Sequence, residues 1–265
     1  MYDFEYVKPS TVADAVSILS ADDTAKALAG GMTFIPVLKQ RFSQPSTVVD
    51  LSGLGLSYLR REDDVLVIGA MTPHGVVAAS PLVQQAIPAL AWLAGHIGDR
   101  QVRNRGTISG SLANNDPSAC YPSAALALNA TIRTDRRDIA ADDYFLGMFA
   151  TALEPGELIT EVRLPIAERA AYVKFPNPAS RYAMVGVFVA KTAVGVRLAV
   201  TGAGQDGVFR HQAFEQALDK SFSASALDGI ETPVDLMNSD IHAGAAYRAH
   251  LVGVIAKRAV EIANG

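Results

Sequence analysis

The sequence has almost no cysteine, since Cys120 is the only one among 265 residues. A single thiol cannot form an internal disulfide, and it cannot supply the four thiolates of an iron–sulfur cluster or a structural zinc site. The chain therefore holds no such cluster by itself, and its composition favours a reducing compartment.

The sequence also lacks a strong excess of one charge. Lys and Arg number 23 against 27 Asp and Glu, which gives a formal net charge of −4 at pH 7. This balance supplies no positive field for a phosphate backbone, so we expect no binding to nucleic acid. His74, His96, His211, His242 and His250 show no metal-ligand spacing, so no metal site is expected.

A long uninterrupted apolar run is missing as well. The most apolar window, Ala183 to Val200, contains Lys191 and Arg197 and is too polar to cross a bilayer. It is better interpreted as two β-strands around a Thr-Ala-Val-Gly turn. The first ten residues, MYDFEYVKPS, lack the basic and apolar regions of a signal peptide. We therefore expect a cytoplasmic protein with no membrane span.

The composition is that of a globular protein with a substantial core, with 49% hydrophobic and 19% charged residues. At roughly 150 residues per domain, the length predicts two compact units or one large unit.

The first fifty residues alternate between strand and helix signals. Phe4 to Val7 and Lys26 to Ala29 are typical of strands, as is Thr47 to Leu51. Ser10 or Thr11 is placed to cap one intervening helix and Thr33 to cap the other. These signals predict a small βαβαβ-like unit, shorter than a dinucleotide-binding half.

The rest of the chain mixes strands with short helices. Strands are expected at Val65–Gly69, Thr131–Arg133 and Leu158–Leu164, helices at Val76–Ala79, Ala86–Gly95 and Ala124–Leu128, and a strand or turn at Thr107–Leu112. A boundary is expected near Pro165 to Arg169. Beyond it, three strands at 171–175, 184–191 and 195–201 precede helices near 212–218 and 243–263. Without strict βα alternation, the pattern favours an α+β fold.

The segment Gly202-Ala203-Gly204-Gln205-Asp206-Gly207 matches the dinucleotide fingerprint G-x-G-x-x-G. That fingerprint requires a helix to begin inside the glycines, whereas here a hairpin turn signal and an extended run follow. We therefore interpret it as a glycine-rich loop. Its use by a nicotinamide dehydrogenase stays open as an alternative that predicts binding of NAD without flavin.

Two other segments are candidates for ligand binding. In AGGMTFIP, from Ala29 to Pro36, a strand leads into two glycines and a hydroxyl residue then opens a helix, an arrangement suited to a diphosphate. In TISGSLANNDP, from Thr107 to Pro117, hydrogen-bonding side chains are dense and Gly110 permits close backbone approach. The residues alone also allow an ordinary strand-to-helix turn and a solvated turn.

Taken together, these segments resemble those of the FAD-binding medium subunits of the molybdenum hydroxylases, the family of carbon monoxide and xanthine dehydrogenases. The family pattern A-G-G-[HQ]-[ST]-L-[IL]-P corresponds to AGGMTFIP, and T-[IV]-G-G-N-x-A followed by D-P corresponds to TISGSLANNDPSAC. Further similar segments are QVRNRG from Gln101, GELIT from Gly156 and KFPNPASRY from Lys174. The resemblance extends over nearly the whole chain.

The resemblance implies an α+β fold with a two-part FAD-binding domain of the para-cresol methylhydroxylase type. This domain would span residues 1–168, with subdomains of about 1–55 and 56–168. A small C-terminal domain, residues 169–265, would hold a three-stranded antiparallel sheet with helices.

The resemblance also implies a cofactor site. The backbone of Ala29 to Thr33 would hold the FAD diphosphate together with Thr107, Ser109, Gly110 and Ser111. Ile97 and Ile159 would pack on flavin or adenine, Lys174 would lie near the polar edge of the isoalloxazine, and Tyr182 would cover one of its faces. The complete expected set is Ala29, Gly30, Gly31, Met32, Thr33, Phe34, Ile35, Ile97, Thr107, Ile108, Ser109, Gly110, Ser111, Asp116, Cys120, Ile159, Lys174 and Tyr182.

Several of these residues depart from the family pattern. Met32 replaces a polar residue, Ser109 a glycine, and Ser111 an asparagine, changes that leave backbone donors and hydroxyls in place. Cys120 stands where many members have an aspartate that contacts the ribitol or ribose region. Asp116 is our candidate for the missing carboxylate acceptor.

The resemblance further implies that the chain is an electron-transfer subunit with no catalytic residue of its own. Electrons would pass from [2Fe-2S] clusters on a small partner subunit through FAD to an external acceptor, and a large subunit with a molybdenum cofactor would oxidise the substrate. We expect a dimer of heterotrimers. Alternatives are a stand-alone flavin oxidoreductase and a flavin-free assembly subunit.

Overall fold

The computed structural model describes residues 1–265, and its N-terminal unit is the expected βαβαβ arrangement. Strands β1 (Glu5–Val7), β3 (Thr47–Asp50) and β2 (Lys26–Leu28) form a parallel sheet in that order, connected through α1 (Val12–Ala21) and α2 (Phe34–Lys39). Thr11 caps α1 by accepting a hydrogen bond from the backbone N–H of Asp14. A short 3-10 helix η1 (Leu51–Gly53) leads out of the unit.

The central part of the chain is built on a five-stranded antiparallel sheet. Its order is β4 (Leu59–Glu62), β5 (Val65–Gly69), β10 (Ile159–Pro165), β6 (Thr131–Thr134) and β7 (Asp138–Ala140). The helices inserted between β5 and β6 are α3 (His74–Ala79), α4 (Pro81–Ala86), α5 (Pro88–Gly95), α6 (Arg100–Arg105), α7 (Ile108–Asn114) and α8 (Tyr121–Ala127). Helix α9 (Ala141–Tyr144) and the hairpin of β8 (Phe145–Gly147) and β9 (Ala150–Thr151) complete this part.

The prediction of a strand or turn at Thr107–Leu112 is wrong, because this segment forms helix α7 with Thr107 as its cap. Its Ser and Gly residues are weak helix formers, which concealed the helix in the sequence. Thr107 caps the helix by accepting a hydrogen bond from the Gly110 N–H at 3.2 Å, and Ile108 and Leu112 are buried in the core. Tertiary packing therefore outweighs local propensity here.

The C-terminal sheet has four strands rather than the three expected. Strands β11 (Arg169–Pro176), β12 (Ala183–Thr192), β13 (Gly195–Gly204) and β14 (Gly207–Arg210) pair in sequence order, all antiparallel. The two strands expected within the apolar window are confirmed as β12 and β13. The additional strand β14 is short and follows Gly204 after the two-residue turn Gln205-Asp206, so the G-x-G-x-x-G segment is a strand end and a hairpin turn, as we interpreted it.

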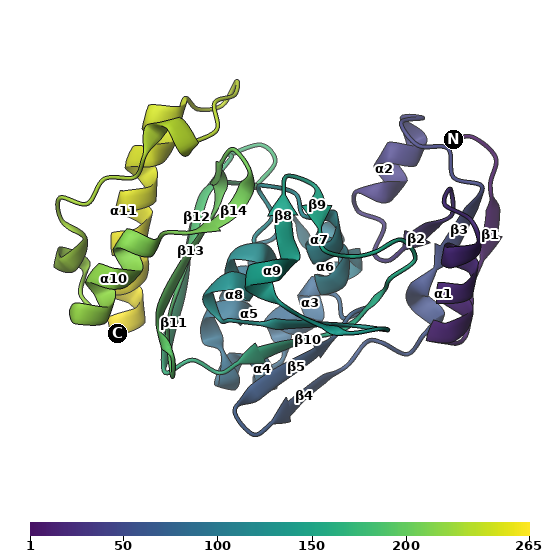
Figure 1. Cartoon of the computed structure of the whole chain (residues 1–265), viewed down its shortest axis with the longest axis horizontal. Coiled ribbons are helices and arrows are strands. Elements are labelled where there is room, and N and C mark those ends of the chain that lie inside the picture. The colour runs from purple at the N-terminus through teal and green to yellow at the C-terminus, as the bar shows by residue number, and fades with distance from the viewer.

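The C-terminal sheet is buried on both faces. Tyr172, Phe188 and Ala199 belong to a core of 33 buried residues shared with α5 and α8. On the other face, β12 and β13 contribute to a second core of 19 buried residues with α10 (Gln212–Lys220) and α11 (Ala245–Asn264). Figure 1 shows this sheet standing between the central helices and α10 and α11. The short 3-10 helices η2 (Ala224–Leu227) and η3 (Val234–Leu236) lie between α10 and α11 in sequence.

No helix combines the length and apolar character needed to cross a membrane.

Candidate functional site

A cavity of about 670 Å³ lies where the three parts of the chain meet, a size typical of cofactor sites. The N-terminal unit contributes the loop between β2 and α2. The central part contributes α6, α7, the loop before α8 and the start of β10, and the C-terminal sheet contributes β11 and the loop after it. No single element could form this cavity, because its walls come from segments more than a hundred residues apart.

Nearly all of the expected cofactor residues line this one cavity. They are Ala29, Gly30, Gly31, Met32, Thr33, Phe34, Ile97, Thr107, Ser109, Gly110, Ser111, Asp116, Cys120, Ile159, Lys174 and Tyr182. The two others lie behind the wall. Ile35 packs against Gly31 from behind and donates its N–H to the Gly31 carbonyl at 3.0 Å, and Ile108 is buried in the core.

The two glycines of the first segment are required by its geometry. A Cβ on Gly30 would lie 2.0 Å from the carbonyl oxygen of Arg105, so the β2–α2 loop approaches the end of α6 backbone to backbone. Gly31 has φ +75°, a conformation that favours glycine. Backbone amides free of side chains thus form one wall of the cavity, which suits a diphosphate.

The second segment is held against the first and against the C-terminal sheet. A Cβ on Gly110 would lie 3.6 Å from the Ala29 side chain, so the two segments are in contact. On the other side, the Gly202 N–H donates to the Pro117 carbonyl at 2.8 Å, and the Thr201 hydroxyl donates to the Ala119 carbonyl at 2.7 Å. Strand β13 therefore fixes the loop that carries Asp116 and Cys120.

Lys174 joins three parts of the cavity wall. Its ammonium donates to the carbonyls of His96 at 2.6 Å and Arg181 at 2.9 Å, and it approaches the Cys120 sulfur at 3.6 Å. The cation thus ties the loop after β11 to the end of α5. Tyr182, on that loop, is 47% exposed, and its pKa is raised by partial desolvation of the hydroxyl and by the neighbouring Asp116 and Cys120.

Asp116 places a carboxylate on the cavity wall. One oxygen accepts the Ser118 N–H at 2.8 Å, and partial burial of the group raises its pKa. A carboxylate acceptor is therefore present in the cavity, at the residue expected to supply it.

Sequence reasoning missed four titratable residues of the cavity: Lys26, His74, Glu157 and Arg181. His74 begins α3 and is buried, with a pKa lowered to about 4 by burial and by the Arg103 charge. Burial opposes ionisation of Glu157, but hydrogen bonds from Arg137, the Glu154 N–H and Thr134 lower its pKa to about 2. Glu157 and Arg181 stand in the family-like segments GELIT and KFPNPASRY, which assigned no role to either, and no motif marked the other two.

The arginines of α6 divide into two kinds. Arg103 donates to the carbonyls of Ile97 and Gly98 at 3.0 Å each and so braces the turn beside the cavity. Arg100 and Arg105 are exposed.

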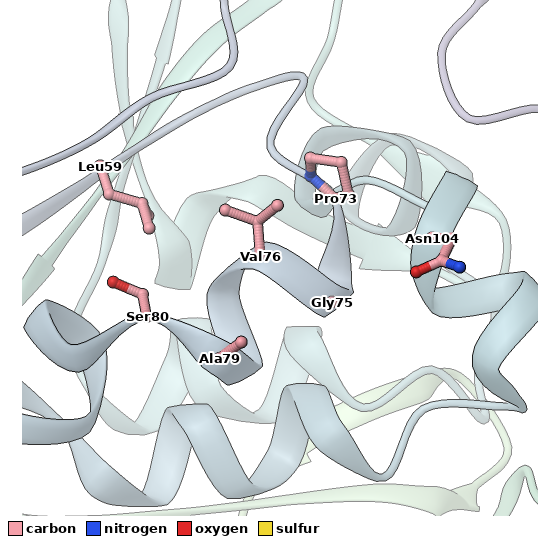
Figure 2. Close-up of a pocket in the computed structure, with 7 residues that line it drawn as sticks. All are labelled: Leu59, Pro73, Gly75, Val76, Ala79, Ser80 and Asn104. Carbon is pink, nitrogen blue, oxygen red and sulfur yellow. The ribbon is translucent and has the colours of Figure 1, made fainter.

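A second hollow of about 650 Å³ lies on the outer side of α3 and has different chemistry. Figure 2 shows its lining, in which Leu59 and Val76 approach from two elements and Asn104 stands at the far side. It contains no titratable side chain, and no group of three His, Cys, Asp or Glu residues in the structure is placed to hold a metal ion. Of the two hollows, only the first is lined by titratable side chains.

The chain belongs to the family described as FAD binding domain in molybdopterin dehydrogenase, whose model matches residues 2–167. FAD is accordingly its cofactor, and the glycine wall and the hydrogen-bonding groups of the cavity fit that molecule.

Relatives of known function are subunits of oxidoreductases. The chain is 33% identical to the carbon monoxide dehydrogenase medium chain of Hydrogenophaga pseudoflava, over 98% of this chain and 96% of that one. It is 34% identical to the nicotine 6-hydroxylase medium subunit of Paenarthrobacter nicotinovorans, over 96% and 95%.

Solved structures agree over the whole chain. Carbon monoxide dehydrogenase from Hydrogenophaga pseudoflava, in a form lacking the Mo-pyranopterin moiety, matches with a TM-score of 0.89 at 34% identity, over 99% of this chain and 97% of that one. Quinoline 2-oxidoreductase from Pseudomonas putida 86 matches with a TM-score of 0.88 at 28% identity, over 100% and 98%. The chain is thus a medium, FAD-binding subunit of the molybdenum hydroxylase kind, and such subunits belong to oxidoreductases.

Proposed function

We propose that this chain carries electrons, through FAD, from [2Fe-2S] clusters on a small partner subunit to an external acceptor. A large partner subunit with the molybdenum cofactor oxidises the substrate. The observation that carries the proposal is the single cavity in which two separate glycine-containing segments of the expected flavin pattern meet.

The roles of the cavity residues follow from their chemistry. Backbone amides of Ala29 to Thr33, with Thr107, Ser109 and Ser111, are donors for a diphosphate. Ile97 and Ile159 offer apolar surface to the rings of FAD. Lys174 keeps a positive charge beside the flavin region, and Tyr182 limits the access of water.

When bound, FAD supplies the ability to take up and pass on electrons. The chain's own contribution is to bind and orient the cofactor, and it has only one cysteine with which to hold any cluster. The electrons therefore come from another chain. The proposed domain limits are 1–168 for FAD binding, with subdomains of about 1–55 and 56–168, and 169–265 for the C-terminal domain.

Three finer features belong to the same proposal. The complex is a dimer of heterotrimers, it resides in the cytoplasm, and the electron acceptor is a separate molecule. The medium chains and subunits to which this chain is similar carry names that place them in multi-subunit enzymes, which supports the presence of partner chains.

The test is purification of the tagged chain from its native host under mild conditions. We expect yellow protein with one FAD per chain, together with a small iron–sulfur subunit and a large molybdenum subunit. Mass measurement of the intact complex then gives the stoichiometry. A colourless chain that does not take up added FAD would contradict the proposal and favour a flavin-free assembly role. Flavin-dependent turnover of an organic substrate by the isolated chain would instead favour a stand-alone oxidoreductase.

A further inference from the structure

His74 is a buried histidine on the wall of the cavity, outside both segments of the expected flavin pattern. Only 4% of its surface is exposed, and its ring lies 5.3 Å from the Tyr121 ring, centroid to centroid. Its backbone N–H donates to the Gly106 carbonyl at 2.9 Å, which fixes the start of α3 against the residue preceding Thr107. The position of the imidazole is therefore set by the fold.

The two ring nitrogens of His74 have no hydrogen-bond partner in the chain. Nδ1 is fully buried without one, and Nε2 faces Gly106, where an added Cβ would lie only 2.6 Å from it. A buried polar group without a partner is costly, and native proteins rarely retain one without a reason. Because Gly106 has no side chain, the ring of His74 fits beside it, and the two residues together form this part of the cavity wall.

His211, the other buried histidine, provides a contrast. Its Nε2 lies 3.1 Å from the Thr232 hydroxyl, and its Nδ1 accepts the Phe214 N–H at 3.3 Å. It lies outside the cavity, and both of its nitrogens are used. The free nitrogens of His74 thus distinguish the histidine that borders the cavity from the one that does not.

The opposite side of α3 has no comparable polar group. Gly75 and Val76 border the shallow outer hollow together with Leu59 and Ser80, as Figure 2 shows. Helix α3 therefore presents its imidazole to the inner cavity and small or apolar groups to the outer hollow.

The surroundings of His74 point to an anion as its partner. Gly106 contacts both the imidazole and the glycine wall, since a Cβ on Gly30 would lie 2.8 Å from the Gly106 Cα, and all three residues line the same cavity. Arg103, whose charge helps to keep the imidazole neutral, also favours a negative group beside it. A neutral imidazole retains one N–H donor, which a phosphate oxygen accepts well.

We infer that His74 binds FAD directly, by donating a hydrogen bond from Nε2–H to a phosphate oxygen of the diphosphate held at the Gly30–Gly31 wall, whereas the fully buried Nδ1 does not reach the cavity. The inference rests on the proposed function, because it requires FAD in this cavity. It adds a side chain that the flavin segments do not contain, and it gives Gly106 a specific purpose.

The experiment measures equilibrium binding of FAD, ADP and riboflavin to the flavin-free protein, by fluorescence and calorimetry. In His74→Phe, which keeps the ring packed on Tyr121, we expect FAD and ADP to bind about tenfold or more weakly, because a hydrogen bond to a charged group is lost. Riboflavin has no phosphate, so its affinity should stay within about twofold. His74→Gln, which retains an amide donor, should recover part of the loss.

Gly106→Ala provides a second route, because its Cβ displaces the imidazole. It should lower the affinity for FAD as His74→Phe does. The double variant should bind FAD no more weakly than whichever single variant has the lower affinity. His211→Phe, a matched change at a buried histidine outside the cavity, should leave FAD affinity unchanged.

The outcomes separate the inference from the function on which it rests. If the unsubstituted protein binds no FAD, the proposed function fails. If it binds FAD and a folded His74→Phe binds FAD and ADP equally well, the inference alone is overturned. Weakening confined to riboflavin would likewise overturn the phosphate assignment. Far-UV circular dichroism and melting temperature establish that each variant is folded.

Discussion

The two walls of the cavity are stabilised in different ways. The first glycine segment stands on the N-terminal unit, whose small core consists of five of its own buried residues and Leu158 from the central part. The second segment, from Thr107 to Cys120, is rooted in a core of 33 buried residues and tied to β13 by hydrogen bonds. A small unit can position a ligand only through close backbone fit, whereas a large core distributes the task over many contacts. Substitutions should therefore have sharper effects on the first wall than on the second.

The largest effect is expected from Gly30→Ala. Its Cβ would lie 2.0 Å from the Arg105 carbonyl oxygen, and because the obstacle is backbone, the N-terminal unit must move away from α6. Overpacking of this kind costs about 1–3 kcal/mol, so we expect FAD affinity to fall roughly 100-fold. Titration of the flavin-free protein with FAD measures this change in affinity.

Gly253→Ala is the matched control for that variant. Gly253 lies within α11, and no atom is within 4 Å of an added Cβ. FAD affinity should stay constant, and stability should rise by about 0.5–1 kcal/mol because alanine favours a helix. Equal FAD binding by Gly30→Ala and this control would refute the close-fit account of the first wall.

The next effect in size tests the tie between β13 and the second wall. Thr201→Val keeps the shape of the buried side chain but leaves the Ala119 carbonyl without its donor. We expect a loss of about 1–3 kcal/mol in stability and a roughly fivefold loss in FAD affinity. Thr201→Ser should restore both.

Thr192→Val serves for comparison, because the Thr192 hydroxyl donates to the Gly195 carbonyl at 2.7 Å in the β12–β13 turn, far from the cavity lining. Thr192→Val should reduce stability and leave the affinity for FAD unchanged. If Thr201→Val and Thr192→Val affect FAD equally, β13 has no positioning role. Chemical denaturation and FAD titration supply the two measurements.

A smaller effect is expected from Lys174→Met. The variant removes the donor to the His96 and Arg181 carbonyls and frees the loop that carries Tyr182. FAD should dissociate about threefold faster, because a hydrogen-bonded tie is worth about 0.5–1.5 kcal/mol and threefold lies at the lower end of that range. Lys191, on β12, forms an ion pair with Glu168, and Lys191→Met should leave the rate of FAD dissociation unchanged. Stopped-flow displacement of FAD compares the two, and identical rates would exclude the proposed tie.

The smallest effect concerns Glu157, whose pKa is lowered to about 2 because hydrogen bonds from Arg137, the Glu154 N–H and Thr134 outweigh burial. An acid with a depressed pKa stabilises the folded state above its unfolded value near 4.5, and this contribution is lost as the pH falls towards 2. Glu157→Gln should therefore cost about 1 kcal/mol at pH 7, and the difference should shrink below about pH 4.5. Urea unfolding at pH 7, 5 and 4 tests this. Exposed Glu168→Gln should show no such trend, and a constant deficit for Glu157→Gln would refute the assignment.

The N-terminal unit could be predicted from the sequence, because its strand residues alternate locally with helix signals, Thr11 caps its first helix, and its glycines are local signals. Helix α7 could not, because its stability comes from the burial of Ile108 and Leu112 in a core assembled from distant strands. The short β14 was missed for a related reason: four residues carry little periodicity of their own, and the strand exists through its pairing with β13.

The cavity shows the same division. Motif residues such as Gly30 and Thr107 were found because their local pattern indicates ligand binding. His74 and Arg181 were missed because each lies outside the glycine segments and reaches the cavity only through the packing of α3 and of the loop after β11. Ile35 and Ile108, chosen for their place in the motifs, lie behind the wall because a motif specifies a backbone path and not which side chains face the ligand.

The burial of the C-terminal sheet on both faces bears on how such subunits can be recombined. Tyr172, Phe188 and Ala199 complete the central core, so a fragment ending near residue 168 would leave that core open to water. Chimeras that exchange the last hundred residues between relatives would need to transplant this inner face together with the helices that pack against it. The central part and the C-terminal sheet thus share one core, although the chain arranges them one after the other.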